Sequence, residues 1–267
     1  MDIGANLTHD SFDPDQAEVI ARARDADVTT MIVTGSDVDT SRAALALCRG
    51  YPGTLYCTAG THPHQAKDFG AAALDALREL LANTEVVAVG ECGLDYFRNF
   101  SPHDVQRQVF ETQLQLAVQT SKPVFLHQRD AHADFMNIVK RYRDRLTAGV
   151  LHCFTGSESE LRDYLALDFY IGVTGWICDE RRGSHLRELV KLIPANRLML
   201  ETDSPYLLPR DLKTKPRAHR NEPMYLAHIC EVMATCIGKS AAQIATETTV
   251  NAQRFFKLPT RPSIQLK

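Results

Sequence analysis

Short apolar runs alternate along the chain with longer segments in which apolar residues recur every three or four positions. The runs predict eight strands, at residues 2–7, 28–34, 54–61, 86–90, 123–127, 149–153, 169–175 and 197–203. The longer segments predict helices at 14–26, 41–50, 71–81, 103–120, 131–145, 158–167, 185–193 and 241–256, and one more that Asn221 caps. Eight strands, each followed by a helix, favour a closed (β/α)8 TIM barrel over an open, doubly wound sheet.

The composition of the chain gives no sign of more than one domain. The chain has 267 residues, of which 44% are hydrophobic, and this is enough for one barrel with a large core. It contains no glycine-rich dinucleotide or phosphate loop, no low-complexity linker and no block of charge. We therefore expect a single α/β domain over residues 1–267.

Charge and cysteine content narrow the class of protein. The 30 Lys and Arg nearly balance the 33 Asp and Glu, which excludes a basic coat but leaves room for one local groove that binds nucleic acid. The seven cysteines form no paired framework, and no signal peptide or membrane-spanning run stands out. These features predict a cytoplasmic protein with reduced thiols and no membrane partner.

Metal-type side chains stand at or just beyond the ends of five predicted strands. They are His62, His64, Glu91, His127, His152 and Asp203. Parallel strands deliver their C-terminal ends to one rim of a barrel, so these side chains are expected to converge. Neutral imidazoles with a carboxylate form a site that leaves room for water and substrate, which is typical of a metal-dependent hydrolase.

Each of these residues also has a purely structural interpretation. His62 and His64 form an H-x-H pair that could bind a metal or a phosphate or support the fold, and a lone histidine after an apolar run is commonly a core residue. Glu91 could pair with an arginine, and Asp203 could cap a loop. Their occurrence together on successive strands favours the metal site. Cys153 is expected to point away from His152 and to pack.

Basic and aromatic residues follow the last predicted strands. The loop at 210–222 carries Arg210, Lys213, Lys215, Arg217, His219 and Arg220, and it comes where anions commonly bind to barrels. It could contact phosphate or remain a solvated charged loop. Arg181 and Arg182 are expected on the same rim. Trp176 and Phe154 could stack on a base or pack against the barrel.

Six motifs together resemble the TatD family of metal-dependent deoxyribonucleases. They are GTHPH (60–64), VGECGLD (89–95), LHQRDA (126–131), LHCFTG (151–156), ETDSPYL (201–207) and RNEP (220–223), and they cover nearly the whole chain. DIGANLT (2–8) and GWICDERRG (175–183) are more similar to the TatD branch than to its sister branches.

This resemblance implies an amidohydrolase-like TIM barrel and a cytoplasmic phosphodiesterase. For the TatD branch it implies a 3′–5′ exonuclease that uses Mg²⁺, or Mn²⁺ as a substitute, on single-stranded DNA and RNA and is linked to repair of oxidative DNA damage. It also implies that Glu91, His127 and His152 bind one or two divalent cations, and that Asp203 completes the centre and accepts a proton from the attacking water. We further expect His62 or His64 to assist the leaving oxygen, Arg129, Lys213, Lys215, Arg217 and Arg220 to contact phosphates, and the protein to be a monomer.

One departure from the family concerns the first predicted strand. Most relatives carry D-x-H-x-H there, whereas Gly4 and Asn6 occupy the two histidine positions in this chain. A second metal would then depend on Asp203, Glu91 and Asn6 or water, an oxygen-rich set that suits Mg²⁺ or Mn²⁺. Histidines at positions 4 and 6 should strengthen that site, unless tight backbone packing requires Gly4.

Two other functions fit the same motifs. An amidohydrolase-type deacylase or deaminase would use the same barrel and metal, because neither one determines the substrate. A non-catalytic binding protein with a decayed site would explain Gly4 and Asn6, although Glu91, His127, His152 and Asp203 are intact.

Overall fold

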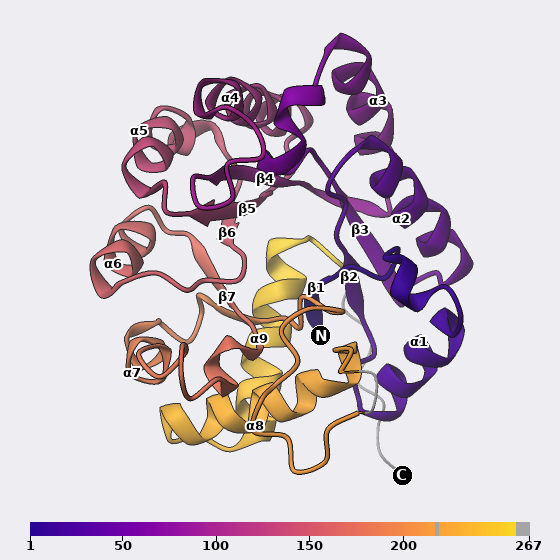
Figure 1. Cartoon of the computed structure of the whole chain (residues 1–267), viewed down its shortest axis with the longest axis vertical. Coiled ribbons are helices and arrows are strands. Elements are labelled where there is room, and N and C mark those ends of the chain that lie inside the picture. The colour runs from indigo at the N-terminus through magenta and orange to yellow at the C-terminus, as the bar shows by residue number, and fades with distance from the viewer. Residues whose placement is uncertain (217–218, 260–267) are drawn as a thin grey trace.

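The computed structural model of the chain describes residues 1–216 and 219–259, and within them eight strands form one parallel sheet in sequence order (Figure 1). The strands are β1 (Asp2–Ala5), β2 (Met31–Val33), β3 (Leu55–Ala59), β4 (Val86–Asp95), β5 (Val124–Arg129), β6 (Gly149–Leu151), β7 (Tyr170–Val173) and β8 (Leu198–Leu200). A parallel bridge between Ala5 and Ser204 connects the last strand region to the first. The predicted TIM barrel is confirmed.

Helices cover this ring of strands, most of them around its outside and α9 across its middle in this view (Figure 1). They are α1 (Gln16–Asp25), α2 (Val38–Gly50), α3 (Ala71–Leu81), α4 (His103–Thr120), α5 (His132–Tyr142), α6 (Glu158–Ala166), α7 (Leu186–Leu189), α8 (Leu226–Ile237) and α9 (Ala241–Phe255). Short 3-10 turns lie between them: η1 (Asp10–Phe12), η2 (Pro63–Asp68), η3 (Arg143–Arg145), η4 (Gly175–Cys178), η5 (Val190–Leu192) and η6 (Pro223–Tyr225). In the part of the chain that is described, no helix is both long and apolar enough to cross a membrane.

The barrel interior is filled by side chains near the N-terminal ends of the strands. Ile3, Phe125 and Met199 belong to this layer and are fully buried. Phe255 and Phe256, at the end of α9, pack against the same layer. The last helix therefore covers the end of the barrel where the strands begin, and the C-terminal ends of the strands remain for the site.

Several predicted bounds are corrected by the structure. The helix predicted at 185–193 is the short α7 followed by η5, because Pro194 forces Ile193 into an extended conformation. Asn221 does not cap a helix; it is buried, and its amide donates to the carbonyl oxygens of Thr202 and Tyr206. Glu222 is the residue that precedes η6.

Two strands are longer than the sequence indicated, which changes how the site is built. β4 continues past Glu91 to Asp95, and β5 continues past His127 to Arg129. Gly93 does not end its strand, because it pairs with His127 across the sheet at a φ of +149°. Glu91 therefore lies inside β4, at the irregularity between the pairs made by Val89 and Cys92, and His127 is paired with Gly93 inside β5.

Gly93 is a site where any side chain should disturb this pairing. A Cβ atom there would lie 1.8 Å from the carbonyl oxygen of His127, and the positive φ adds strain for an L-residue. We expect Gly93→Ala to lower the free energy of unfolding by at least about 2 kcal/mol in urea denaturation. Gly50→Ala, in α2, is the control, since nothing lies within 4 Å of its Cβ position. Equal midpoints for the two variants would contradict this account.

Candidate active site

The centre of the site is the carboxylate of Glu91, which is only 6% exposed. Its Oε1 atom lies 2.9 Å from Nδ1 of His127, 3.0 Å from Nε2 of His152 and 3.3 Å from Nε2 of His62. Burial alone would raise the pKa of Glu91, but the imidazoles around it, His152 foremost, hold that pKa well below its usual value. The structure thus brings three of the predicted imidazoles onto one ionised oxygen.

Asp95 links two of the predicted histidines and was missed by the sequence analysis as a site residue. Its Oδ2 atom lies 2.7 Å from Nε2 of His64 and 3.5 Å from Nε2 of His127. Its Oδ1 atom accepts from the backbone N–H groups of Phe97 and Arg98. Burial would raise the pKa of Asp95, but hydrogen bonds from His127 and His64 lower it well below its usual value. Asp95 follows Glu91 by four residues, so alternation along β4 was an available signal.

Glu201 is a second buried carboxylate that the sequence analysis did not assign. Its Oε2 atom lies 3.0 Å from Nδ1 of His152, and its Oε1 atom accepts from the backbone N–H of Cys153. Burial would lower the pKa of His152, but Glu91 and Glu201 together raise it well above its usual value. Glu201 therefore orients the His152 ring, with Nε2 turned toward Glu91. The signal was a second acid two positions before Asp203.

The Glu201 side chain also explains the glycine on the first strand. A Cβ atom on Gly4 would lie 2.5 Å from Oε2 of Glu201, and one on Gly172 would lie 2.6 Å from Oε1. Both glycines leave space for one carboxylate, so the close packing at Gly4 is with a side chain rather than with backbone. A histidine at position 4 would have to displace Glu201 before it could bind a metal.

Asp203 and Asn6 lie together at the other side of the cluster. Nδ2 of Asn6 donates to Oδ1 of Asp203 at 3.0 Å and to the carbonyl oxygen of Ser204. Burial raises the pKa of Asp203 to about 7. A carboxyl group with this pKa is suited to exchange a proton near neutral pH.

The donor set fits a divalent cation. Potential ligand atoms of His62, Glu91 and His127 lie within 4.8 Å of one another. Nε2 of His127 makes no hydrogen bond of standard geometry with the carboxylate oxygen beside it, Oδ2 of Asp95 at 3.5 Å, so it is available to a ligand once the ring is neutral. Nδ1 of His62 accepts from the backbone N–H of His64, so the neutral ring carries its proton on Nε2, toward Glu91. His152, with its other nitrogen on Glu201, is better oriented than His62 to be the second imidazole ligand.

A cavity of about 770 Å³ lies over this cluster. Three aromatic residues that line it are unusually exposed for their type: Phe97 at 56%, Phe100 at 57% and Tyr206 at 51%. Arg129 and Arg182 also line it, and their guanidinium carbons lie 5.0 Å from the Phe97 ring centre and 5.9 Å from that of Trp176, respectively. The sequence analysis did not identify the exposed aromatic residues, which lie on loops without a hydrophobic pattern.

The predicted phosphate-binding residues are placed differently from one another. Of the four that belong to the described residues, only Arg129 lines the cavity over the cluster. Lys213 and Lys215 are exposed on the loop that follows β8, and Arg217 lies outside the described residues. Arg220 forms ion pairs of 2.8 Å with Asp15 and with Glu222, which join this loop to the start of α1.

Comparison with known proteins is consistent with this geometry. The family model of TatD related DNases matches residues 1–257. The chain belongs to the TatD family. It is therefore a hydrolase, and the resemblance stated from its motifs is confirmed.

TatD proteins of known sequence and structure are similar over nearly the full length. A 3′-5′ ssDNA/RNA exonuclease TatD of Erwinia tasmaniensis is 49% identical over 97% of this chain and 100% of its own length. Its counterpart in Edwardsiella piscicida is 50% identical over 97% and 99%. The crystal structure of YJJV, a TatD homologue of Escherichia coli K12, superposes with a TM-score of 0.87 at 30% identity, covering 97% and 98% of the two chains.

Because the pKa of Asp203 is raised in the folded protein, ionising this residue should lower the free energy of unfolding. The pKa is about 7 when folded against an ordinary 3.8, so metal-free protein should lose stability as pH rises from about 4 to about 7. Asp203→Asn, which keeps an oxygen to accept from Asn6, should raise the melting temperature more at pH 8 than at pH 4. Thermal scans in chelator measure this, and an equal change at both pH values would contradict it.

Proposed function

We propose that this TatD-family hydrolase is a metal-dependent exonuclease that removes nucleotides from the 3′ ends of single-stranded DNA and RNA. The observation that carries the proposal is the cluster of imidazoles on Glu91 beneath a cavity rimmed by exposed aromatic side chains and arginines. The names of the relatives at 49% and 50% identity support the polarity and the substrates. Mg²⁺ is the proposed cation, with Mn²⁺ as a substitute, because the carboxylates of Glu91 and Asp203 are hard oxygen donors.

The residues of the cluster divide the work among them. Glu91, His127 and His152 would hold the cation, with Asp203 beside it. A bound divalent cation would supply Lewis-acid activation of water and neutralise charge on the phosphate. Asp203 accepts the proton of the attacking water; burial raises its pKa in the metal-free protein, and a cation beside it would favour the ionised form that can act as a base.

Two further histidines are placed for the leaving oxygen. His64 is held by Asp95 at 2.7 Å, and His62 presents its Nε2 proton toward the cluster. Either one can donate a hydrogen bond to the oxygen that departs from the phosphorus. Arg129 lies partly exposed over the Phe97 ring and holds the phosphate of the strand at the mouth of the cavity.

The lining of the cavity favours a nucleic acid over the substrate of a deacylase or deaminase. Exposed aromatic rings offer faces for stacking bases, and arginines beside them offer charge to phosphates. A small amide substrate needs neither. The intact cluster on Glu91 also argues against a non-catalytic protein with a decayed site, since buried ionisable groups are costly to retain without a use.

Metal dependence and polarity can be tested in one assay. Metal-stripped protein would be given single-stranded DNA and RNA labelled at the 3′ or the 5′ end, and then Mg²⁺, Mn²⁺ or Zn²⁺. We expect single nucleotides released from the 3′ end with Mg²⁺ or Mn²⁺. Activity that is complete in chelator, or cleavage only of amide substrates in a parallel panel, would refute the proposal.

Replacing Glu91 should remove both the metal and the activity. Glu91→Gln loses the charge that three imidazoles surround, so we expect metal content to fall and the cleavage rate to drop by more than about 100-fold. Bound metal is measured by mass spectrometry and folding by circular dichroism. Glu18→Gln, an exposed position on α1, is the control. If the Glu91→Gln protein keeps normal metal content and full activity, Glu91 is not a metal ligand.

The loop after β8 provides a second test, because its cations differ in placement. We propose that Lys213, Lys215 and Arg217 contact phosphates away from the reacting one, and that Arg220 instead holds the loop to α1. Lys213→Ala with Lys215→Ala should raise KM and reduce the salt slope of oligonucleotide binding by about 1–2.

Arg220→Ala should leave that slope unchanged. It should instead lower the melting temperature by about 2–8 °C, because Asp15 and Glu222 each lose a charged hydrogen bond. If Arg220→Ala instead keeps its melting temperature and reduces the salt slope, Arg220 contacts phosphate, as the sequence predicted, and does not hold the loop.

A role in repair of oxidative DNA damage and a monomeric, cytoplasmic state are also part of the proposal. They rest on the resemblance to the TatD branch. Sensitivity of a deletion strain to hydrogen peroxide tests the repair role, and light scattering tests the monomer.

A further inference from the structure

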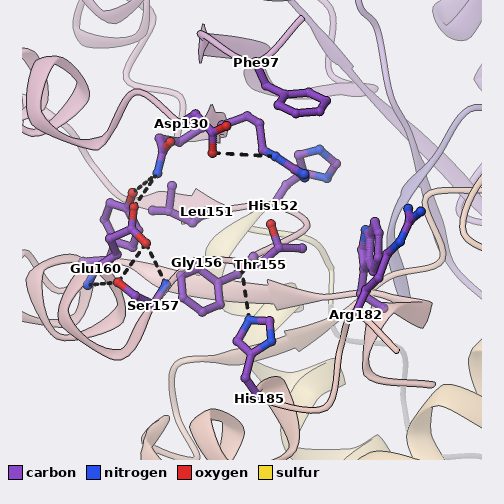
Figure 2. Close-up of a pocket in the computed structure, with 15 residues that line it drawn as sticks. Phe97, Asp130, Leu151, His152, Thr155, Gly156, Ser157, Glu160, Arg182 and His185 are labelled. Atoms are coloured by element: carbon purple, nitrogen blue, oxygen red, sulfur yellow. Dashed lines mark hydrogen bonds and ion pairs between the residues drawn. The ribbon is translucent and has the colours of Figure 1, made fainter. Parts of the chain in front are cut away.

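A second cavity of about 760 Å³ opens beside the one that contains the metal cluster. The two cavities share lining residues, which are Phe97, Gln128, Arg129, His152, Thr155, Trp176 and Arg182. Figure 2 shows Phe97 at one side of the second cavity, Arg182 at another, and Ser157 and Glu160 across from Arg182. A strand bound at the cluster can therefore extend into this space without leaving the protein surface.

From this arrangement we infer that the second cavity is a subsite for a nucleobase, namely that of a nucleotide next to the scissile phosphodiester. The inference rests on the proposed function, because it requires the phosphodiester at the Glu91 cluster. It adds a binding site that the metal centre does not define, and it assigns Phe97 and Trp176 to substrate positioning.

The walls of the second cavity suit a flat apolar ring. Phe97 is 56% exposed, although a large aromatic side chain is normally buried. Leu151 and Phe154 line the inner wall, and Phe154 is fixed edge-on against Tyr164 with ring centres 6.2 Å apart. Trp176 is half-buried and presents part of its ring to both cavities. Base stacking on such rings tolerates every base, since each one has a π-face.

The carboxylates that line the second cavity favour a base over a phosphate. Asp130 is exposed beside Arg129, at 4.0 Å, and the less exposed Glu160 is held by the backbone N–H and hydroxyl of Ser157. These oxygens would repel a phosphate, but they can accept a hydrogen bond from the exocyclic amine of a base.

Positive charge lies instead where the two cavities meet. Arg129 and Arg182 line both cavities, and each lies over an aromatic ring, at 5.0 Å from Phe97 and 5.9 Å from Trp176. A phosphate linking two nucleotides would pass between these arginines while the base enters the acidic, aromatic space beyond. Along this path the scissile phosphate would lie at the metal cluster, the next phosphate between the arginines, and the base beside the carboxylates.

Trp176 provides a direct probe, because it is the only tryptophan in the chain. A trinucleotide would be titrated, with Mg²⁺ present, into Asp203→Asn protein, which should bind without cleaving. We expect quenching of the tryptophan fluorescence. The same trinucleotide with an abasic residue at one of its two 3′-terminal positions should quench less and bind about 5- to 100-fold more weakly.

Substitutions at Phe97 separate stacking from a general structural role. In the same Asp203→Asn background, Phe97→Ala should bind the intact and abasic trinucleotides equally, and Phe97→Tyr should restore the difference. In otherwise unchanged protein, Phe97→Ala should raise KM more than it lowers kcat. Leu192→Ala is the control, because Leu192 is a 42% exposed hydrophobic residue on η5 that lines neither cavity.

The outcomes distinguish the subsite from the proposed function. Suppose that unchanged protein degrades single strands, but that an abasic residue at either 3′-terminal position leaves binding and quenching unaltered. The inference of a base subsite is then wrong, and the proposed exonuclease function stands. The subsite is also wrong if Phe97→Ala retains the full preference for the intact trinucleotide. If no single strand is cleaved with any metal, the proposed function itself is overturned, and the subsite with it.

Discussion

The contact on which the rest of the site depends is the buried carboxylate of Glu91 with imidazoles from three other parts of the barrel. An ionised carboxylate that is only 6% exposed is costly unless partners surround it. His127 comes from β5, His152 follows β6, and His62 follows β3. These partners reach one oxygen only if the intervening strands hold their register, so the imidazole cluster on Glu91 and the closure of the barrel impose the same constraint. The pairing of Gly93 with His127, which admits no Cβ, is one place where that register is set.

A second constraint acts through missing side chains. Glu201 takes the space beside Gly4 on β1 and Gly172 on β7, and from there it orients His152. The glycine that replaces the first histidine of D-x-H-x-H thus leaves no empty space for a ligand, because the carboxylate of Glu201 fills the space that a side chain at position 4 would need. At position 6, the amide of Asn6 is engaged as a donor to Asp203. Its oxygen is therefore on the far side of the amide from Asp203, and a second cation would depend on Asp203 and Glu91 rather than on β1.

Local pattern predicted most of the fold, because helices and strands are encoded by nearby residues. The bounds of α3 and α4 match their predictions, since an apolar face at helical spacing ends where each helix ends. The predicted end of β4 was wrong, because glycines such as Gly90 and Gly93 are typical of a turn yet can lie within a strand. The end of β5 was wrong because β5 continues beside the longer β4, where Gln128 and Arg129 pair with Leu94 and Asp95. Asp95 and Glu201 were not assigned, because their partners lie about 30 to 50 residues away in sequence. The ion pair of Arg220 with Asp15 spans 205 positions, and no local pattern indicates it.

The distribution of ion-pair partners over the molecule also explains how a chain with a formal net charge of −3 would bind the nucleic acid of the proposed function. Arg22 and Arg220 are neutralised by Asp15 and Glu222, so their charge holds the fold together. At the mouth of the site, by contrast, Arg129 and Arg182 lie over aromatic rings. A ring face orients a guanidinium without cancelling its charge, and the carboxylate paired with Arg129, that of the exposed Asp130, lies 4.0 Å away, so both cations remain available to phosphate. In the proposed function, binding would depend on where the less neutralised arginines lie, and Arg129 and Arg182 both line the cavity over Glu91.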